Sequence, residues 1–281
     1  HYPLRRQRQM CIRDSYRLGD FYEMFFDDAI VVSKELELTL TGKSCGAEER
    51  APMCGVPYHA VEGYLNKLVA NGHKVAICEQ VEDPKLAKGL VKREVIRIVT
   101  PGTNTDMQAL DESKNNYIMC IVYLADKYGI SLADISTGDY FVTEVDTERK
   151  LIDEINKFAP SEIICNESFY MSGVDLSDMK NRLGIAVYSL EAWYFSDETA
   201  ENTLKEHFKV QSLEGLGLSD YACGTIAAGA LLRYLYETQK NDLGNLSAIH
   251  PYSTGKYMII DSSTRRNFCL LYTSDAADEE D

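Results

Sequence analysis

Near the start of the chain, the segment GDFYEMFF at residues 19–26 places three aromatic residues and a glutamate within six positions of a glycine. Side chains two residues apart in a β-strand point to the same face. Phe21 and Glu23 are therefore predicted to share one face of a strand, with Tyr22 on the other. A flat apolar ring beside a carboxyl group suits stacking on a planar base while the edge of the base is read. An ordinary edge strand with aromatic core residues stays open as the alternative, because short motifs are weak signals.

The composition is that of a globular protein with room for two domains. The chain has 281 residues, of which 45% are hydrophobic and 26% charged. Its formal net charge of −15 argues against a dispersed basic coat for nucleic acid. Residues 16–110 carry 11 basic and 14 acidic residues (11 − 14 = −3), whereas residues 111–243 carry 11 and 23 (11 − 23 = −12). The first part is therefore the one expected to approach a polyanion such as DNA.

The cysteines indicate neither a metal site nor a disulfide framework. There are eight, irregularly spaced and without a C-x-x-C pair, so reduced, buried thiols in a cytoplasmic protein are expected. His59 has no cysteine or second histidine nearby and is interpreted as structural. No apolar run reaches the 18 or so residues of a membrane span, and no secretory signal is visible. We therefore predict no metal site and no membrane contact.

The two ends differ in character from the rest of the chain. Residues 1–15 carry four arginines and little periodicity, and residues 271–281 are acidic. Both resemble translated sequencing-linker sequence, and the alternative is a genuine basic arm and a genuine acidic tail. We leave both out of the fold prediction. We draw no inference about DNA binding from Arg5, Arg6 or Arg8.

The first part is predicted to be a sheet with two helices, ending at a domain boundary near residues 111–114. Asp27 and Asp28 are expected to provide an N-cap and favourable first-turn charge for the first helix. Gly42-Lys43-Ser44 is not the end of a phosphate-binding loop, because Glu37 stands where that motif needs a glycine. The expected elements are a strand over 16–26 with a turn at residues 19–20, a helix through 36, a β-prone piece at 38–41, a loop over 42–52, a turn at 55–60, a helix over 61–70, and buried strands over 74–81 and 94–99.

The second part begins with strands and then alternates helix and strand, which predicts a sheet with helices packed on it. Gly224 and Gly229 are interpreted as small residues at a packed contact. The expected strands are 117–124, 129–135, 139–145, 162–165 and 185–189, and the expected helices are 147–158, 197–208 and 219–240. A further strand at 257–261 and the opening of a helix at 262–267 suggest a chain that is truncated soon after an element begins.

Five motifs in order make the chain resemble the MutS DNA mismatch-repair family from about residue 16 to residue 270. They are YRLGDFYEMF at 16–25, GVPYHA at 55–60, AICEQ at 76–80, RIVTPGT at 97–103 and DSSTRRN at 261–267. The resemblance implies an α/β (mixed α+β) fold with three parts. Residues 16–110 would be a mixed-sheet mismatch-recognition domain, residues 115–243 an RNase-H-like connector domain, and residues 244–270 the beginning of a helical core.

The resemblance also implies what the rest of such a protein does. The lever and clamp helices and the ATPase domain, which binds ATP and Mg²⁺ and makes the homodimer, would lie beyond this chain. The fragment itself would be no enzyme and would hold no cofactor. Its expected partners are duplex DNA with a mismatch or small loop and, at the connector, a downstream repair protein. A bacterial cytoplasmic, nucleoid-associated location is expected.

In the family, a Phe-x-Glu pair enters the minor groove at a mispair, and Phe21 and Glu23 match it. The phenylalanine stacks on one mispaired base and the glutamate hydrogen-bonds to it. Lys43 and Arg93 are weaker candidates for contact with the DNA backbone, and Gln80 for contact in the groove.

Two alternatives come from other functional classes. An RNase-H-like connector could carry Asp134 and Asp139 as Mg²⁺ ligands of a nuclease. We favour the interpretation that these two aspartates cap turns, since no further acidic group has a convincing spacing. The acidic second part could instead serve only as a protein-interaction module.

Overall fold

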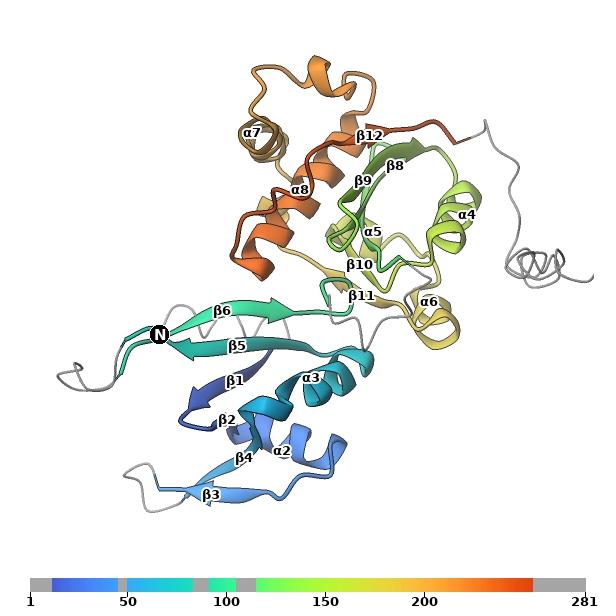
Figure 1. Ribbon diagram of the computed structural model, residues 1–281. Coiled ribbons are helices and arrows are strands. Elements are labelled where there is room, and N and C mark those ends of the chain that lie inside the picture. The colour runs from blue at the N-terminus through green and yellow to red at the C-terminus, as the bar shows by residue number, and fades with distance from the viewer. Residues whose placement is uncertain (1–11, 45–49, 83–90, 105–114, 255–281) are drawn as a thin grey trace, which may run out of the picture. The chain divides into compact units, whose positions relative to one another are not determined.

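The structure, a computed structural model, describes residues 12–44, 50–82, 91–104 and 115–254. It contains two six-stranded sheets with helices packed on them (Figure 1). Contacts group the chain into two compact units, of which the first includes the whole first sheet and the second most of the other. The mixed α/β class predicted from the sequence is confirmed. None of the described helices is long and apolar enough to cross a bilayer.

The first sheet has the strand order β3-β4-β2-β1-β5-β6. Only the β1–β5 pair is parallel, and the other neighbours are antiparallel, so the sheet is mixed as expected. Its strands are β1 (Ile12–Leu18), β2 (Phe21–Phe25), β3 (Thr41–Lys43), β4 (Ala51–Pro57), β5 (Lys74–Gln80) and β6 (Arg93–Val99).

The strand expected over residues 16–26 is a tight hairpin of β1 and β2. Leu18 pairs with Phe21, and Gly19 takes a φ of 63° in the two-residue turn between them. A left-handed backbone of this kind is adopted readily by glycine, which has no Cβ. The hairpin thus places Phe21 directly beside the turn.

The structure includes residues 12–15 in β1, although the sequence analysis left residues 1–15 out of the fold. Long-range pairing explains the difference, because this end of β1 lies parallel to β5 from the Ile12–Lys74 pair onward. The Asp28 carboxylate accepts hydrogen bonds from the Arg13 guanidinium at 2.9 Å and from the Asp14 N–H at 3.1 Å. These contacts accommodate polar residues in a strand position.

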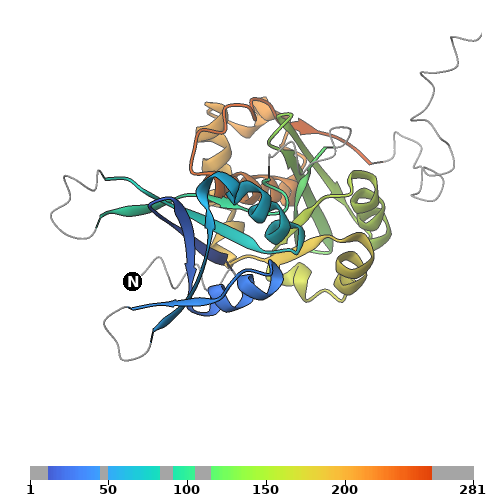
Figure 2. The same cartoon turned by 60° about the horizontal axis from the view of Figure 1, so that its bottom comes forward.

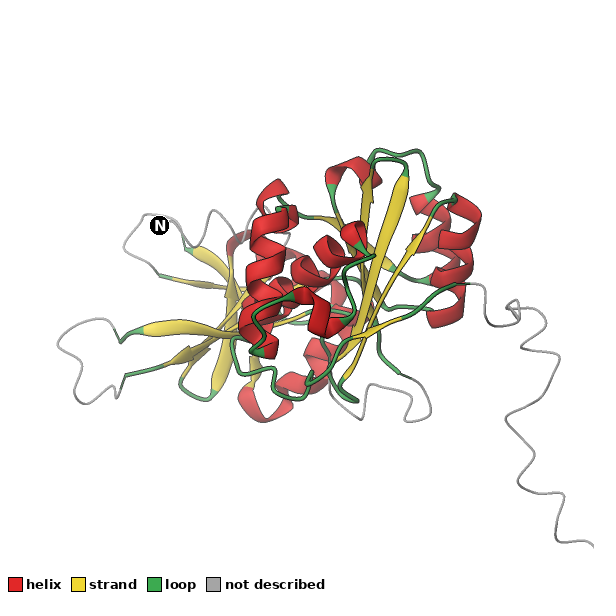
Figure 3. Cartoon of the chain, turned by 90° about the horizontal axis from the view of Figure 1, so that it is seen from above, coloured by secondary structure: helices red, strands yellow, loops and turns green. Residues whose placement is uncertain are grey.

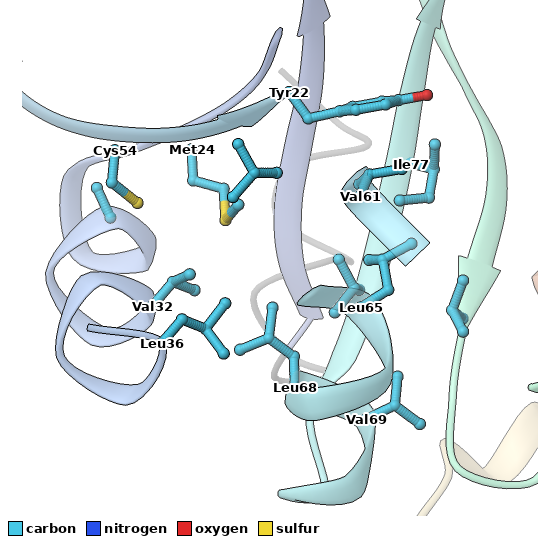
Figure 4. Packing of buried hydrophobic residues seen from close by; sticks show 14 residues of the cluster. Tyr22, Met24, Val32, Leu36, Cys54, Val61, Leu65, Leu68, Val69 and Ile77 are labelled. Carbon is cyan, nitrogen blue, oxygen red and sulfur yellow. The ribbon is translucent and has the colours of Figure 1, made fainter. Parts of the chain in front are cut away.

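Helices α2 (Phe26–Glu35) and α3 (Val61–Ala70) cover one face of the first sheet (Figures 1 and 2). Figure 4 shows Val32, Leu65 and Leu68 of these helices in one apolar cluster with Tyr22 and Met24 of β2. The period of apolar residues in α3 predicts its bounds correctly. This core fixes which face of β2 is buried.

Three local predictions in this sheet need correction. The cap of α2 is Phe25, without a side-chain hydrogen bond, while Asp27 and Asp28 lie in the first turn, where negative charge is still favourable. β3 begins at Thr41, so Lys43 belongs to a strand and not to a loop. The expected turn at 55–60 is the end of β4 followed by a 3₁₀ turn, Tyr58–Ala60. Pairing with neighbouring strands overrides local turn preference in both cases.

The second sheet has the order β11-β10-β7-β8-β9-β12. If β12 is set aside, the strand that comes first in the sequence (β7) lies between the second (β8) and the fourth (β10). This is the arrangement expected of an RNase-H-like sheet. Its strands are β7 (Ile118–Leu124), β8 (Lys127–Asp134), β9 (Asp139–Val145), β10 (Glu162–Cys165), β11 (Ala186–Ser189) and β12 (His250–Pro251).

Helices lie on both faces of the second sheet (Figure 3). Phe141 of β9 contacts Phe158 of α4, while the next residue, Val142, lies against Gly224 of α8. Adjacent strand residues point to opposite faces, so α4 and α8 pack on different sides. The helices are α4 (Glu148–Phe158), α5 (Glu167–Tyr170), α6 (Leu176–Leu183), α7 (Asp197–Phe208) and α8 (Ala222–Gln239).

Two short helices, α5 and α6, escaped the sequence analysis. Each has a side-chain cap: Asn166 accepts from the Phe169 N–H, and Asp175 accepts from the N–H groups of Ser177 and Asp178. Both residue types are strong N-cap signals, which was the information available in the sequence. The strand expected at 257–261 and the helix opening at 262–267 lie outside the described residues.

The small residues predicted at a packed contact of α8 are in close contact with their neighbours. A Cβ on Gly229 would lie 2.3 Å from the Ala200 Cα of α7, and a Cβ on Gly224 would lie 2.8 Å from a methyl carbon of Val142. At Gly63 of α3, in contrast, a Cβ would meet nothing within 4 Å. Close approach of the two helix backbones therefore requires glycine at position 229.

We predict that Gly229→Ala destabilises the protein by about 1–3 kcal/mol, because overpacking outweighs the helix-propensity gain of about 1 kcal/mol. The control Gly63→Ala should stabilise by about 0.5–1 kcal/mol, since only propensity acts there. Urea unfolding followed by far-UV circular dichroism measures both effects, and Trp193 fluorescence reports on the second unit, which contains Gly229. A stabilising Gly229→Ala would contradict the packing.

Candidate nucleic-acid interface

Strand β2 presents two different faces, as the alternation in the sequence predicts. Tyr22 and Met24 are buried under α2 and α3, whereas the Phe21 side chain at the turn is 47% exposed. Phe21, Glu23 and Phe25 share the face opposite these helices. The structure thus brings Phe21 and Glu23 to one surface, with the ring directed outward.

The carboxylate of Glu23 is held by Lys43. The Lys43 Nζ lies 2.6 Å from Glu23 Oε2 and 5.5 Å from the centre of the Phe25 ring. The lysine comes from β3 and reaches diagonally across β4. Gly55 of β4 pairs with Glu23, and a Cβ there would lie 3.5 Å from the Glu23 Cγ.

Gln80 of β5 and Arg93 of β6 support the hairpin through hydrogen bonds to β1. The Gln80 amide donates to the Arg17 carbonyl at 3.5 Å, and the Arg93 Nε donates to the same oxygen at 3.3 Å. The Arg93 hydrogen bond is the shorter of the two and therefore the stronger. Both side chains are partly buried in these contacts. Their expected DNA contacts stay predictions, and what the structure gives them is a role in positioning β1.

Arg17 is a residue of this site that the sequence analysis missed. Its Nε donates to the Gly19 carbonyl at 2.6 Å, and its guanidinium lies 4.3 Å from the centre of the Tyr58 ring. The Tyr58 N–H in turn donates to the Asp20 carbonyl at 2.9 Å. The turn that precedes Phe21 is therefore tied down on both sides. An arginine two residues before a turn glycine was the available signal.

Tyr22 anchors the buried face of the hairpin. Its hydroxyl donates to a Glu79 carboxylate oxygen, and Arg17 lies 3.8 Å from the same carboxylate. Burial, together with the hydrogen bond and charge of Glu79, raises the pKa of Tyr22 to about 12. The neutral phenol is thus the form that the fold favours.

The carboxylates suggested for a nuclease are occupied by structural hydrogen bonds. Asp134 is buried and accepts from the Ser136 N–H at 2.8 Å and from the Asn116 N–H at 2.9 Å. Asp139 accepts from the Asn115 amide and, at 3.1 Å, from the Tyr117 hydroxyl. No three metal-binding side chains gather anywhere in the described ranges. The Ser136 bond supports the turn-capping interpretation for Asp134, whereas Asp139 bonds side chains 22 and 24 residues away and caps no turn through them.

Comparison with known proteins agrees with this arrangement. The mixed sheet with its braced hairpin and the RNase-H-like sheet after it define a two-module α/β protein whose candidate site is an exposed surface of the first sheet. The family described as MutS domain I matches residues 3–108, and MutS domain II matches residues 116–247. The chain belongs to the MutS family. The first match begins inside the segment that the fold prediction left out.

Several bacterial proteins named DNA mismatch repair protein MutS are similar to the chain. That of Lachnoclostridium phytofermentans is 65% identical over 258 residues, covering 92% of this chain and 28% of that protein. That of Ruminiclostridium cellulolyticum is 48% identical over 273 residues, 96% of this chain and 31% of that protein. That of Clostridioides difficile is 46% identical over 260 residues, with 92% and 27% covered. The chain thus spans about three tenths of the length of these relatives.

We predict that Tyr22→Phe changes the pH dependence of stability. The folded pKa of about 12 lies above the usual 10, so the tyrosine stabilises fully below pH 10 and loses this contribution as the pH rises from 10 to 12. At pH 8 the variant should be less stable by about 1 kcal/mol, the net value of the lost hydrogen bond. The deficit should shrink above pH 10. Urea unfolding across pH 8–11.5 measures it, and a deficit constant with pH would contradict the assignment.

Proposed function

We propose that this chain recognises mispaired or unpaired bases in duplex DNA, as part of a MutS protein. The ring of Phe21 would enter the minor groove and stack on one base of the mispair, and Glu23 would hydrogen-bond to that base. The observation that carries the proposal is the exposed Phe21 ring on a braced hairpin, with Glu23 on the same face. The similarity to bacterial proteins named DNA mismatch repair protein MutS supports it.

The energies favour a wedge that acts only at a weak point of the duplex. Unstacking a base step costs a few kcal/mol, and least where pairing is already faulty. Stacking of an aromatic ring on a base returns about 1–3 kcal/mol. At a matched pair the two terms nearly cancel, whereas at a mispair the stacking exceeds the cost. Specificity then comes from deformability, because mismatches share no fixed pattern of base atoms.

Affinity is proposed to depend on other parts of the protein. With a formal net charge of −15, the chain offers little general attraction to phosphates and should bind DNA weakly on its own. In the family, clamp helices and a homodimer hold the duplex, and a separate ATPase domain uses ATP and Mg²⁺. The present chain would act as the reader and connector and would catalyse no reaction.

The second unit is proposed to offer a docking surface to a downstream repair protein. It contains most of the acidic excess, and the end of α5 exposes apolar side chains: Tyr170 is 47% and Met171 75% exposed. Exposed apolar groups surrounded by charge are typical of protein contacts. This would be a further role beside DNA recognition.

Phe21→Ala is expected to abolish the preference for mismatched DNA, because the stacking contribution of about 1–3 kcal/mol is lost, which corresponds to roughly 5- to 150-fold in affinity. Tyr170→Ala is the matched control, since it removes an aromatic side chain of the same exposure from the second unit. Fluorescence anisotropy with matched and mismatched duplexes at fixed salt measures both. A preference that survives Phe21→Ala would remove the wedge from the mechanism.

Glu23→Ala is expected to narrow the gap between mismatched and matched DNA without weakening binding to matched DNA. A carboxylate near phosphates is unfavourable unless a base donates a hydrogen bond to it, so its removal relieves repulsion at the matched duplex. The same anisotropy measurement tests this. Equal losses on both duplexes would show that Glu23 has only a structural role.

A further inference from the structure

We propose that Lys43 is a specificity-determining residue that keeps Glu23 paired until a mispaired base takes its place. In the free protein and on matched DNA the Lys43–Glu23 pair stays closed. At a mispair the base binds the carboxylate, and the released ammonium group binds a nearby phosphate. The inference rests on the proposed function, because it assigns a regulatory contact to the same site.

The geometry of the pair supports an exchange of partners. The two charged groups lie 2.6 Å apart, but the Lys43 side chain is 45% exposed while that of Glu23 is 16% exposed. Glu23 lies in β2, a strand that is paired with β1 on one side and with β4 on the other. Lys43 lies in β3, a three-residue strand at the edge of the sheet. The lysine is thus the partner that can turn away while the carboxylate stays in place.

The energies allow the Lys43–Glu23 ion pair to open when a base donates a hydrogen bond to the carboxylate. An exposed ion pair contributes little free energy, because solvent and salt screen it. A single charge-assisted hydrogen bond from a base is therefore enough to replace the lysine. Without that bond, opening the pair would leave a bare carboxylate among phosphates, which is unfavourable. The pair consequently opens only where the base can donate.

The exchange makes a measurable difference between the two duplexes. Each phosphate contact adds about 0.9 to the slope of log affinity against log salt. If Lys43 is released only at a mispair, the salt slope is steeper for mismatched DNA and unchanged for matched DNA. If Lys43 contacts phosphate in every complex, the slope is steeper for both duplexes. If the ion pair has no role in binding, Lys43 changes the slope for neither duplex.

The test measures affinity of the chain for matched and mismatched duplexes over a series of salt concentrations. For the native sequence, the slope should be steeper on mismatched DNA by about one unit. Lys43→Met should remove this difference, and Glu23→Gln, which frees Lys43 at all times, should raise the matched slope to the mismatched value. Lys150→Met is the matched control: Lys150 is 49% exposed and pairs with Asp146 at 2.7 Å in the second unit. It should leave the difference between the slopes unchanged.

The outcomes separate this inference from the proposed function. Lys43→Met could lower the salt slopes on both duplexes equally, or on neither, while the mismatch preference still depends on Phe21. In that case the exchange of partners is wrong, and the proposed role of Phe21 is unaffected. If the native chain shows no mismatch preference, or Phe21→Ala keeps it, the proposed function itself fails.

Chemical cross-linking gives a second readout that does not depend on affinity. A carbodiimide joins a carboxylate and an amine only when the two are in contact, and mass spectrometry of the peptides detects the amide. The Lys43–Glu23 cross-link should form in the free chain and with saturating matched duplex, and should drop severalfold with saturating mismatched duplex. The Lys150–Asp146 cross-link serves as the internal control and should be the same in all three. No cross-link in the free chain, or an equal yield with both duplexes, would overturn the inference.

Discussion

Burial of Tyr22 and Met24 beneath α2 and α3 is the constraint on which the candidate site depends. Because side chains alternate along a strand, fixing these two inside fixes Phe21 and Glu23 outside. A shift of one residue in the pairing of β2 would reverse both sets and place a charged group in the core. Such a shift would expose a large apolar area to water and is therefore costly, so the core determines the orientation of Phe21 and Glu23.

Under the proposed function the hairpin must also be rigid, since a ring that yields as it enters the duplex could not unstack a base. The hairpin meets this need through contacts from distant parts of the chain. Gln80 and Arg93 donate to one carbonyl of β1, while Arg17 and the Tyr58 N–H hold the turn itself. The polar side chains of Arg17, Gln80 and Arg93 thus stabilise the conformation of the hairpin in the structure without DNA.

In the second sheet, two carboxylates that suggest metal chemistry instead stabilise the fold. Asp134 accepts from the N–H of Ser136 in the turn that follows it and from the N–H of Asn116, 18 residues earlier, while Asp139 accepts from the side chains of Asn115 and Tyr117. A buried carboxylate is stable only when hydrogen bonds compensate its lost hydration. An RNase-H-like sheet can therefore keep acidic residues near strand ends for structural reasons alone.

The sequence by itself determined the features that depend on local periodicity. The alternation in β2, helices α3 and α7, and strands β9 and β10 follow from patterns within a few residues, and their predicted bounds agree with the structure. Only the tertiary structure decided the inclusion of residues 12–15 in β1, the pairing of Lys43 with Glu23, and the use of Gln80 and Arg93 as braces. These contacts join residues 20 to 76 positions apart, and local propensity carries no information about such partners.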